Sequence, residues 1–229
     1  RRSAGTIAFV GDGATPDKYK IGLDAIEREN GLGIPIFKPR LDNEEIIKRI
    51  KAAEKAKALA VGIDIDAAVF KTMALRNQAV APKSMSELKE LKSATKLPFI
   101  LKGIINPRDV EMALKAGADA IIVSNHGGRV LDEMPGSMDV LEDIVKAAAG
   151  SLTIMVDGGF RDGVDILKAL ALGAQYVLIG RPVAIAAVGM GIEGTAFYMN
   201  HIRDELQKAM LLTGCGSIRE ITRDVVLSL

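Results

Sequence analysis

Two residues able to do chemistry lie just past an apolar run within residues 120–132, which read AIIVSNHGGRVLD. His126 is of the residue type best suited to move protons near neutral pH, and Arg129 offers a planar fork for a carboxylate or a phosphate. Their spacing therefore favours acid–base chemistry on an anionic substrate. The alternative is a strand followed by a Gly-Gly turn, whose polar residues take no part in catalysis.

Glycines and arginines follow the last two apolar runs, as DGGFR at residues 157–161 and GRP at residues 180–182. Glycines let backbone N–H groups come close to an anion, and Arg161 and Arg181 can add charge-assisted hydrogen bonds. Together the two segments predict a phosphate site, and tight turns are the alternative. Lys102 ends an earlier apolar run, where an ammonium would stabilise negative charge on a ligand, although such a lysine is more often only solvated.

The elements that must position these side chains are short apolar runs alternating with segments of helical period. Runs that are apolar throughout predict strands covered on both faces, as in a parallel sheet flanked by helices. The predicted strands are residues 6–10, 33–37, 58–63, 98–101, 120–123, 153–156 and 176–179. The predicted helices are residues 43–56, with Asn43 as N-cap, then 86–93, 107–116, 137–148 and 163–172, followed by a helix around 198–212.

Polar or glycine-rich residues follow almost every predicted strand. An open doubly wound sheet concentrates such residues near one switch point, whereas a barrel directs every carboxyl end to one mouth. We therefore predict an α/β fold, a (β/α)8 TIM barrel formed by residues 1–229 as one domain and lacking its first strand. The chain starts Arg1-Arg2-Ser3 and reaches its first strand almost at once, so we expect a missing N-terminal segment.

Composition argues against several classes of function. The formal net charge is +1, from 30 basic and 29 acidic residues, so no overall field attracts nucleic acid or an anionic membrane. The absence of Trp leaves few platforms on which bases could stack. No apolar run approaches the roughly 20 residues that span a bilayer. The lone Cys215 rules out an internal disulfide and a cysteine-based metal site. We expect a soluble, cytoplasmic protein.

The motifs together resemble the FMN-dependent α-hydroxy acid dehydrogenase and oxidase family, the group of glycolate oxidase, lactate oxidase and flavocytochrome b2. The segments that carry the resemblance are KG at residues 102–103, SNHGGR at 124–129, DGGFR at 157–161 and GRP at 180–182. The earlier segments look like a bacterial branch of the family. The resemblance implies an FMN cofactor and oxidation of an L-2-hydroxy acid of the lactate or glycolate type. It also implies an electron acceptor, oxygen or another, and assembly into a homo-tetramer or octamer.

The resemblance also implies roles for particular residues. His126 would be the base that accepts the substrate's proton, Asp64 would hydrogen-bond to it, and Arg129 would bind the substrate carboxylate. Independently, a carboxylate beside an imidazole stabilises its charged form and fixes its orientation. Lys102 would stabilise the reduced flavin ring. The residues implied to hold FMN are Lys102, Ser124, Asp157, Gly158, Gly159, Arg161, Gly180 and Arg181.

Departures from the family pattern leave the substrate open. Gly33 and Pro35 are aligned with positions where the family usually has Gln and Tyr, and the segment continues as KPR at residues 38–40. A second carboxylate-binding arginine has no clear counterpart, and Lys71 is the nearest cation. Two alternative functions therefore stay open. One is an FMN-dependent isomerase of the type 2 isopentenyl diphosphate isomerase kind, and the other is a non-catalytic flavin- or phosphate-binding barrel.

Overall fold

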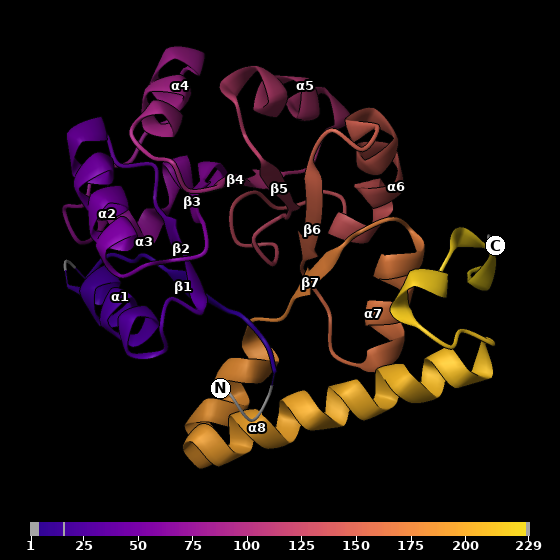
Figure 1. Cartoon of the computed structure of the whole chain (residues 1–229). Helices are drawn as coiled ribbons and strands as arrows, with labels where there is room; N and C mark the ends of the chain where they lie inside the picture. The colour runs from indigo at the N-terminus through magenta and orange to yellow at the C-terminus, as the bar shows by residue number, and fades with distance from the viewer. Residues whose placement is uncertain (1–4, 16, 228–229) are drawn as a thin grey trace.

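The computed structural model describes residues 5–15 and 17–227, in which strands and helices alternate along the chain (Figure 1). The strands are β1 (Ala8–Gly11), β2 (Gly33–Phe37), β3 (Val61–Asp64), β4 (Phe99–Ile104), β5 (Ala120–Val123), β6 (Thr153–Asp157) and β7 (Tyr176–Leu178). The helices are α1 (Lys18–Arg28), α2 (Asn43–Lys55), α3 (Lys71–Ala74), α4 (Met85–Ser93), α5 (Pro107–Ala116), α6 (Ser137–Ala148), α7 (Gly163–Ala171) and α8 (Arg181–Leu212). Short 3-10 turns cover Ile65–Val69, Ile218–Glu220 and Arg223–Val225.

All the strands run parallel, and each pairs with the next along the chain, in the order β1-β2-β3-β4-β5-β6-β7. The sheet curls around an axis with helices on its outer side (Figure 1). Among the described residues, β1 and β7 do not pair with each other, so the barrel is partial. The predicted fold, a TIM barrel without its first strand, is confirmed. That residues 1–229 form a single domain stays a prediction.

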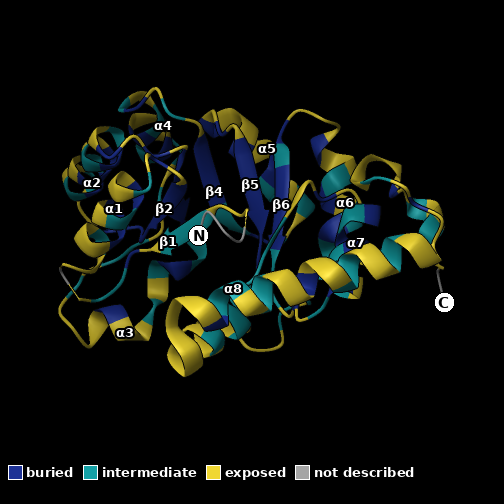
Figure 2. Ribbon diagram, turned by 60° about the horizontal axis from the view of Figure 1, so that its bottom comes forward, coloured by how far each residue is buried: buried dark blue, intermediate teal, exposed yellow. Residues whose placement is uncertain are grey.

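Burial on both faces of the sheet explains why the strands are apolar throughout. Phe37, Ile63 and Ile121 face outward and pack against the helices. Figure 2 shows β5 as buried along its length and most of β4 as buried, and in β4 Lys102 and Gly103 are half-buried. The residues that fill the inside of the barrel are Ile34, Ile36, Ala60, Ile100, Ala120, Ile122 and Met155. Below the mouth the barrel is therefore a packed core and not a channel.

The helices differ from the prediction in several places, and helix α3 and the start of α8 at Arg181 are among them. The N-cap of α2 is Asp42 and not Asn43, because Asp42 has an extended backbone and its carboxylate accepts the Glu44 N–H at 2.9 Å. The Asn43 side chain instead donates to Glu90 of α4 at 2.6 Å. Helix α1 is not predicted at all, because its buried face is narrow and includes Gly22.

Helix α8 is two helical segments joined at Met190 and Gly191, whose backbone angles are not helical. Figure 1 shows the bend, after which the second segment passes below the end of α7 in this view. By length and composition α8 could cross a membrane, contrary to the expectation that no segment would qualify. This is weak support for a span, because the break interrupts the helix and a span needs about 20 continuous apolar residues.

Candidate active site

A cavity of about 510 Å³ opens at the carboxyl ends of the strands. Lys102 lines it from β4, and Asp157 lines it from β6. His126 and Arg129 line it from the loop after β5, and Gly180 lines it from the connection between β7 and α8. Its volume lies in the range of small-molecule sites, roughly 300–1,000 Å³. The fold therefore brings residues far apart in the sequence to one site.

Ser124 fixes the start of the loop that carries His126. Its hydroxyl is fully buried, accepts the His126 backbone N–H at 3.0 Å and lies 2.9 Å from Lys102 Nζ. His126 itself has φ 57°, a left-handed conformation that is uncommon for a residue with a side chain. Ser124 thus orients two neighbours in the site, and its direct contact with a flavin stays a prediction.

Asp64, at the end of β3, is paired with two lysines. Its Oδ2 lies 2.5 Å from Lys38 Nζ and its Oδ1 lies 3.2 Å from Lys102 Nζ. The carboxylate is 7% exposed and each lysine side chain is 11% exposed. Burial opposes ionisation of Asp64, but Lys102 and Lys38 outweigh it and lower the pKa of the carboxyl to about 2. Asp64 is therefore an anion held by cations.

Two carboxylates, those of Asp64 and Asp157, keep Lys102 charged. Burial acts to lower its pKa, yet Asp64 and Asp157 overcome burial and raise the pKa of the ammonium. Asp157 Oδ2 lies 3.4 Å from Lys102 Nζ. A buried ammonium thus points into the cavity, as the prediction for Lys102 requires.

The nearest carboxylate to His126 is Asp66 and not the predicted Asp64. His126 Nδ1 lies 2.9 Å from Asp66 Oδ1 and 3.5 Å from Asp64 Oδ1. Burial raises the pKa of Asp66, and the hydrogen bond with His126 works in the opposite direction. The three side chains lie close enough together to bind a metal ion. The two lysines on Asp64 make this an unfavourable place for a cation.

A bulge in β4 makes room for Asp66. The register between β4 and β5 shifts between Lys102 and Ile104, and the intervening Gly103 has φ 104°. A Cβ at Gly103 would lie 2.6 Å from the Cβ and Cγ atoms of Asp66. Only a glycine can therefore occupy this position without displacing Asp66.

The ring of Phe70 contacts three of the side chains at the site. The Arg129 guanidinium lies 4.8 Å from the ring centroid, Lys38 Nζ lies at 4.7 Å, and the His126 ring meets it edge to face at 4.7 Å. Cation–π contacts of this kind restrain a flexible cation without using its hydrogen-bond donors. Arg129 is otherwise exposed, so its fork remains available to an anion.

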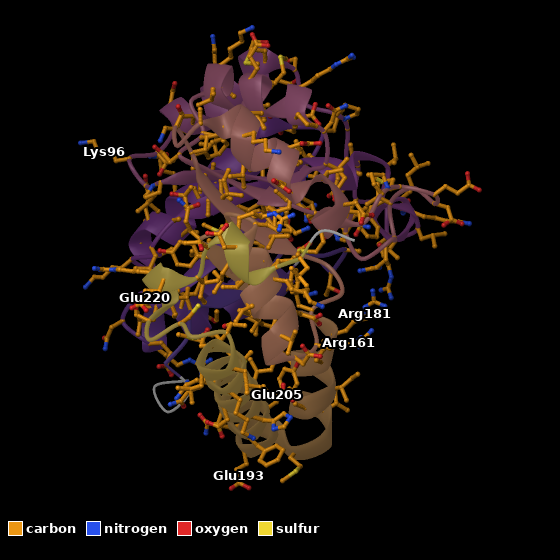
Figure 3. All side chains as sticks on the ribbon, turned by 90° about the vertical axis from the view of Figure 1, so that its right-hand side faces the viewer. Lys96, Arg161, Arg181, Glu193, Glu205 and Glu220 are labelled. Carbon is orange, nitrogen blue, oxygen red and sulfur yellow. The ribbon has the colours of Figure 1, made fainter. Side chains whose placement is uncertain are left out.

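The predicted phosphate residues gather at the last two strands. Arg161 and Arg181 are both exposed, and Figure 3 shows them projecting from the same side of the molecule. Arg181 donates to the Gly127 carbonyl at 3.1 Å, which ties the His126 loop to the start of α8. The Ser137 hydroxyl donates to the Asp157 carbonyl at 2.5 Å, and Gly158, with φ 103°, packs beside it.

Lys38 and Asp66 are site residues that the sequence reading missed. In β2, Ile34 and Ile36 face the barrel interior, so the period of two carries Lys38 into the cavity. Gly33 faces α1, because a Cβ there would meet Ile26, so this position does not reach the cavity. Counting alternate residues from Ile34 could have found Lys38.

Lys71, the cation nearest to the position of the expected second arginine, is exposed on α3 and does not line the cavity.

Comparisons with known proteins identify the family of the chain. The model of the FMN-dependent dehydrogenase family matches residues 80–228. The chain belongs to the FMN-dependent dehydrogenase family. It is 37% identical to a 2-hydroxyacid oxidase of Dictyostelium discoideum over 218 residues, which is 90% of the chain and 56% of the relative. It is 36% identical to glycolate oxidase 5 of Oryza sativa subsp. japonica, covering 99% of the chain and 58% of the relative.

Solved structures of this family give the same result. A crystal structure of mandelate oxidase with (S)-2-phenylpropionate superposes with a TM-score of 0.83 at 32% identity, covering 97% of this chain and 69% of that one. A second mandelate oxidase structure, with benzoyl-formic acid, gives a TM-score of 0.78 at 34% identity, covering 88% of this chain and 64% of that one. The chain thus spans little more than half the length of the two curated relatives above and about two thirds of these solved chains.

The residues at the mouth fit the FMN on which this family of dehydrogenases depends. Asp157 Oδ1 is buried and has no hydrogen-bond partner among the described residues. A Cβ at Gly159 or at Gly180 would meet no atom within 4 Å, so the backbone there faces open space. The start of α8 at Arg181 adds helix N–H groups that favour a phosphate. Unpartnered polar atoms, open backbone and positive charge are what a phosphorylated cofactor needs.

Proposed function

We propose that this protein oxidises an L-2-hydroxy acid to the 2-oxo acid with FMN as cofactor. The observation that carries the proposal is the convergence of a histidine, an exposed arginine and a buried ammonium on one cavity. Bound FMN would supply the chemistry of accepting the two electrons that the substrate loses. The named relatives, a 2-hydroxyacid oxidase and a glycolate oxidase, support the same substrate class.

The protein's own residues would bind the acid and accept its proton. Arg129 would receive the substrate carboxylate in its fork, where Phe70 restrains the guanidinium from one side. His126 Nδ1 is directed towards Asp66, so Nε2 is the nitrogen left to accept a proton at the cavity. Lys102 would hold positive charge against the flavin ring, where negative charge collects on reduction. Asp157, Arg161, Arg181 and the neighbouring glycines would hold the ribityl chain and phosphate.

Anaerobic reduction of the bound flavin tests the proposal. The protein, loaded with FMN, is mixed without oxygen with L-lactate, glycolate or (S)-mandelate while the visible flavin absorbance is recorded. We expect bleaching with at least one acid and a loss of roughly 10²-fold or more in its rate in His126→Gln. His201→Gln is the matched control, because His201 is exposed on α8 beside Glu205, away from the cavity. A loaded protein that no 2-hydroxy acid reduces would refute the proposal.

The isomerase alternative has no support among the named relatives and structural neighbours, which are oxidases. The electron acceptor, the cytoplasmic location and assembly into a homo-oligomer remain predictions.

A further inference from the structure

His126 faces two aspartates, and the geometry gives them different tasks. We propose that Asp66 is the positioning residue that fixes the orientation and tautomer of His126. The ion pair between Lys38 and Asp64 keeps Asp64 from taking this role. The proposal rests on the proposed function, in which His126 is the base. It also corrects the expectation, taken from the family resemblance, that Asp64 serves the histidine.

Distances separate the two carboxylates. The 2.9 Å from His126 Nδ1 to Asp66 Oδ1 is an ordinary hydrogen-bond length. The 3.5 Å from Nδ1 to Asp64 Oδ1 lies beyond the usual range for an N–H donor. Asp66 therefore accepts the ring N–H, whereas Asp64 contributes charge from farther away.

The ion pairs of Asp64 explain why it cannot turn to the histidine. Lys38 holds one carboxylate oxygen at 2.5 Å and Lys102 holds the other at 3.2 Å. Both lysines are nearly buried, so water cannot easily replace Asp64 as their partner. Rotating Asp64 towards His126 would leave a buried ammonium unpaired.

Asp66 forms no ion pair with Lys38 or Lys102. Its Oδ2 is buried without a hydrogen-bond partner among the described residues, and its Oδ1 has His126 as its hydrogen-bond partner. The bulge at Gly103 provides the space in which Asp66 lies. Asp66 and Asp64 are the carboxylates near Nδ1, and Lys38 and Lys102 pair with Asp64. Arg129 and Lys38 lie, like His126, against the ring of Phe70.

The consequence for the base is the position of its proton. An Nδ1–H donated to Asp66 leaves the lone pair on Nε2, which faces the cavity. When Nε2 accepts the substrate's proton, the imidazolium forms beside a carboxylate that makes no ion pair with Lys38 or Lys102. Asp66 then acts through His126 and does not touch the substrate.

Nitrogen-15 NMR of the imidazole rings tests this directly, because the chain has only two histidines. His201→Gln assigns the remaining signals to His126. Spectra are recorded for the 229-residue chain with FMN added, at a pH where the imidazole is neutral. We expect the Nδ1–H tautomer in the unsubstituted chain and its loss in Asp66→Ala. In Asp64→Asn, with Lys38→Met to balance the charge, we expect the tautomer to be retained.

A rescue variant distinguishes positioning from a general structural effect. Asp66→Ala combined with Lys38→Met frees Asp64 Oδ2, so we expect the Nδ1–H tautomer to return in part. An unchanged tautomer in Asp66→Ala, or its loss in the Asp64→Asn and Lys38→Met pair alone, would overturn the proposal.

Kinetics of Asp66→Asn cover the case in which the alanine variant does not fold. This nearly isosteric change keeps an acceptor oxygen but removes the charge, so we expect the rate of flavin reduction by the acid to fall at least about tenfold with little change in KM. An undiminished rate would overturn the proposal. If no 2-hydroxy acid reduces the unsubstituted protein, the proposed function fails, while the NMR result still decides the role of Asp66.

Discussion

Lys38, Asp64 and Lys102 form a charged cluster that is almost closed to solvent. Removing one partner of a buried ion pair is far more costly than removing an exposed pair, because the remaining charge stays desolvated. In this cluster the loss of Asp64 would remove the carboxylate partner of Lys38 and one of the two carboxylate partners of Lys102. The cluster therefore makes Asp64 important for stability as well as for the site.

We expect Asp64→Asn to lower the free energy of unfolding by about 3 kcal/mol, measured by urea denaturation. Adding Lys38→Met should recover part of that loss, because it removes the buried ammonium that Asp64→Asn leaves without a carboxylate partner. The matched control is Lys115→Met, which breaks the exposed pair between Lys115 and Glu111 on α5. Its effect should stay below about 1 kcal/mol. Equal effects in Asp64→Asn and Lys115→Met would contradict the assignment of a buried cluster.

At the scale of elements, the bulge in β4 positions the side chain of Asp66, which follows β3. Gly103 combines a positive φ with a Cβ direction that runs into Asp66. A substituent there must distort the bulge, displace Asp66, or do both. The catalytic geometry after β5 thus depends on a backbone detail of its neighbour.

Gly103→Ala should destabilise the protein by roughly 1–3 kcal/mol and also weaken the hydrogen bond between Asp66 and His126. Gly150→Ala is the control, because Gly150 has φ 77° but open space around its Cβ. We expect both variants to lose stability in denaturant and only Gly103→Ala to change the His126 ring signals. Identical ring signals in the two variants would show that the bulge does not position Asp66.

The sequence predicts most of the elements because apolar runs and helical periods reflect burial, which extends over many residues. It does not predict which of two nearby aspartates meets the histidine. That choice depends on Lys38, which follows β2, and on Gly103 in β4, and neither is adjacent to the DID segment at 64–66 in sequence. The direction of Lys38 was readable from the alternation of Ile34 and Ile36, but the 2.5 Å contact with Asp64 needs the closed geometry of the barrel.

For the whole molecule, the depressed pKa of Asp64 links folding to pH. The folded-state pKa of about 2 lies below the usual unfolded value of roughly 3.9, so the ionised carboxylate stabilises the fold above pH 4 or so. This contribution is lost as pH falls from the unfolded value through the folded one. The loss comes from protonating the anion that holds two lysines.

Acid unfolding should therefore be less steep in Asp64→Asn between about pH 4 and pH 2, by a total of about 2 kcal/mol. The measurement is the free energy of urea unfolding at a series of pH values. Glu87, whose pKa is lowered to about 2 mainly by hydrogen bonds from the Ser84 backbone and side chain, titrates in the same window. Comparing the two proteins cancels its contribution, and parallel curves would contradict the role given to Asp64.

Arg129 and the two lysines place positive charge in one cavity under different exposure to solvent. Mobile ions screen an exposed guanidinium over about 8–10 Å at moderate salt but reach a buried ammonium poorly. Ionic strength should therefore act on substrate capture alone. Between about 20 mM and about 0.5 M NaCl we expect the KM for a 2-hydroxy acid to rise several-fold while kcat changes less than about twofold. The salt dependence would then distinguish the exposed charge of Arg129, which would bind the acid, from the buried charges of Lys38 and Lys102, which mobile ions reach poorly.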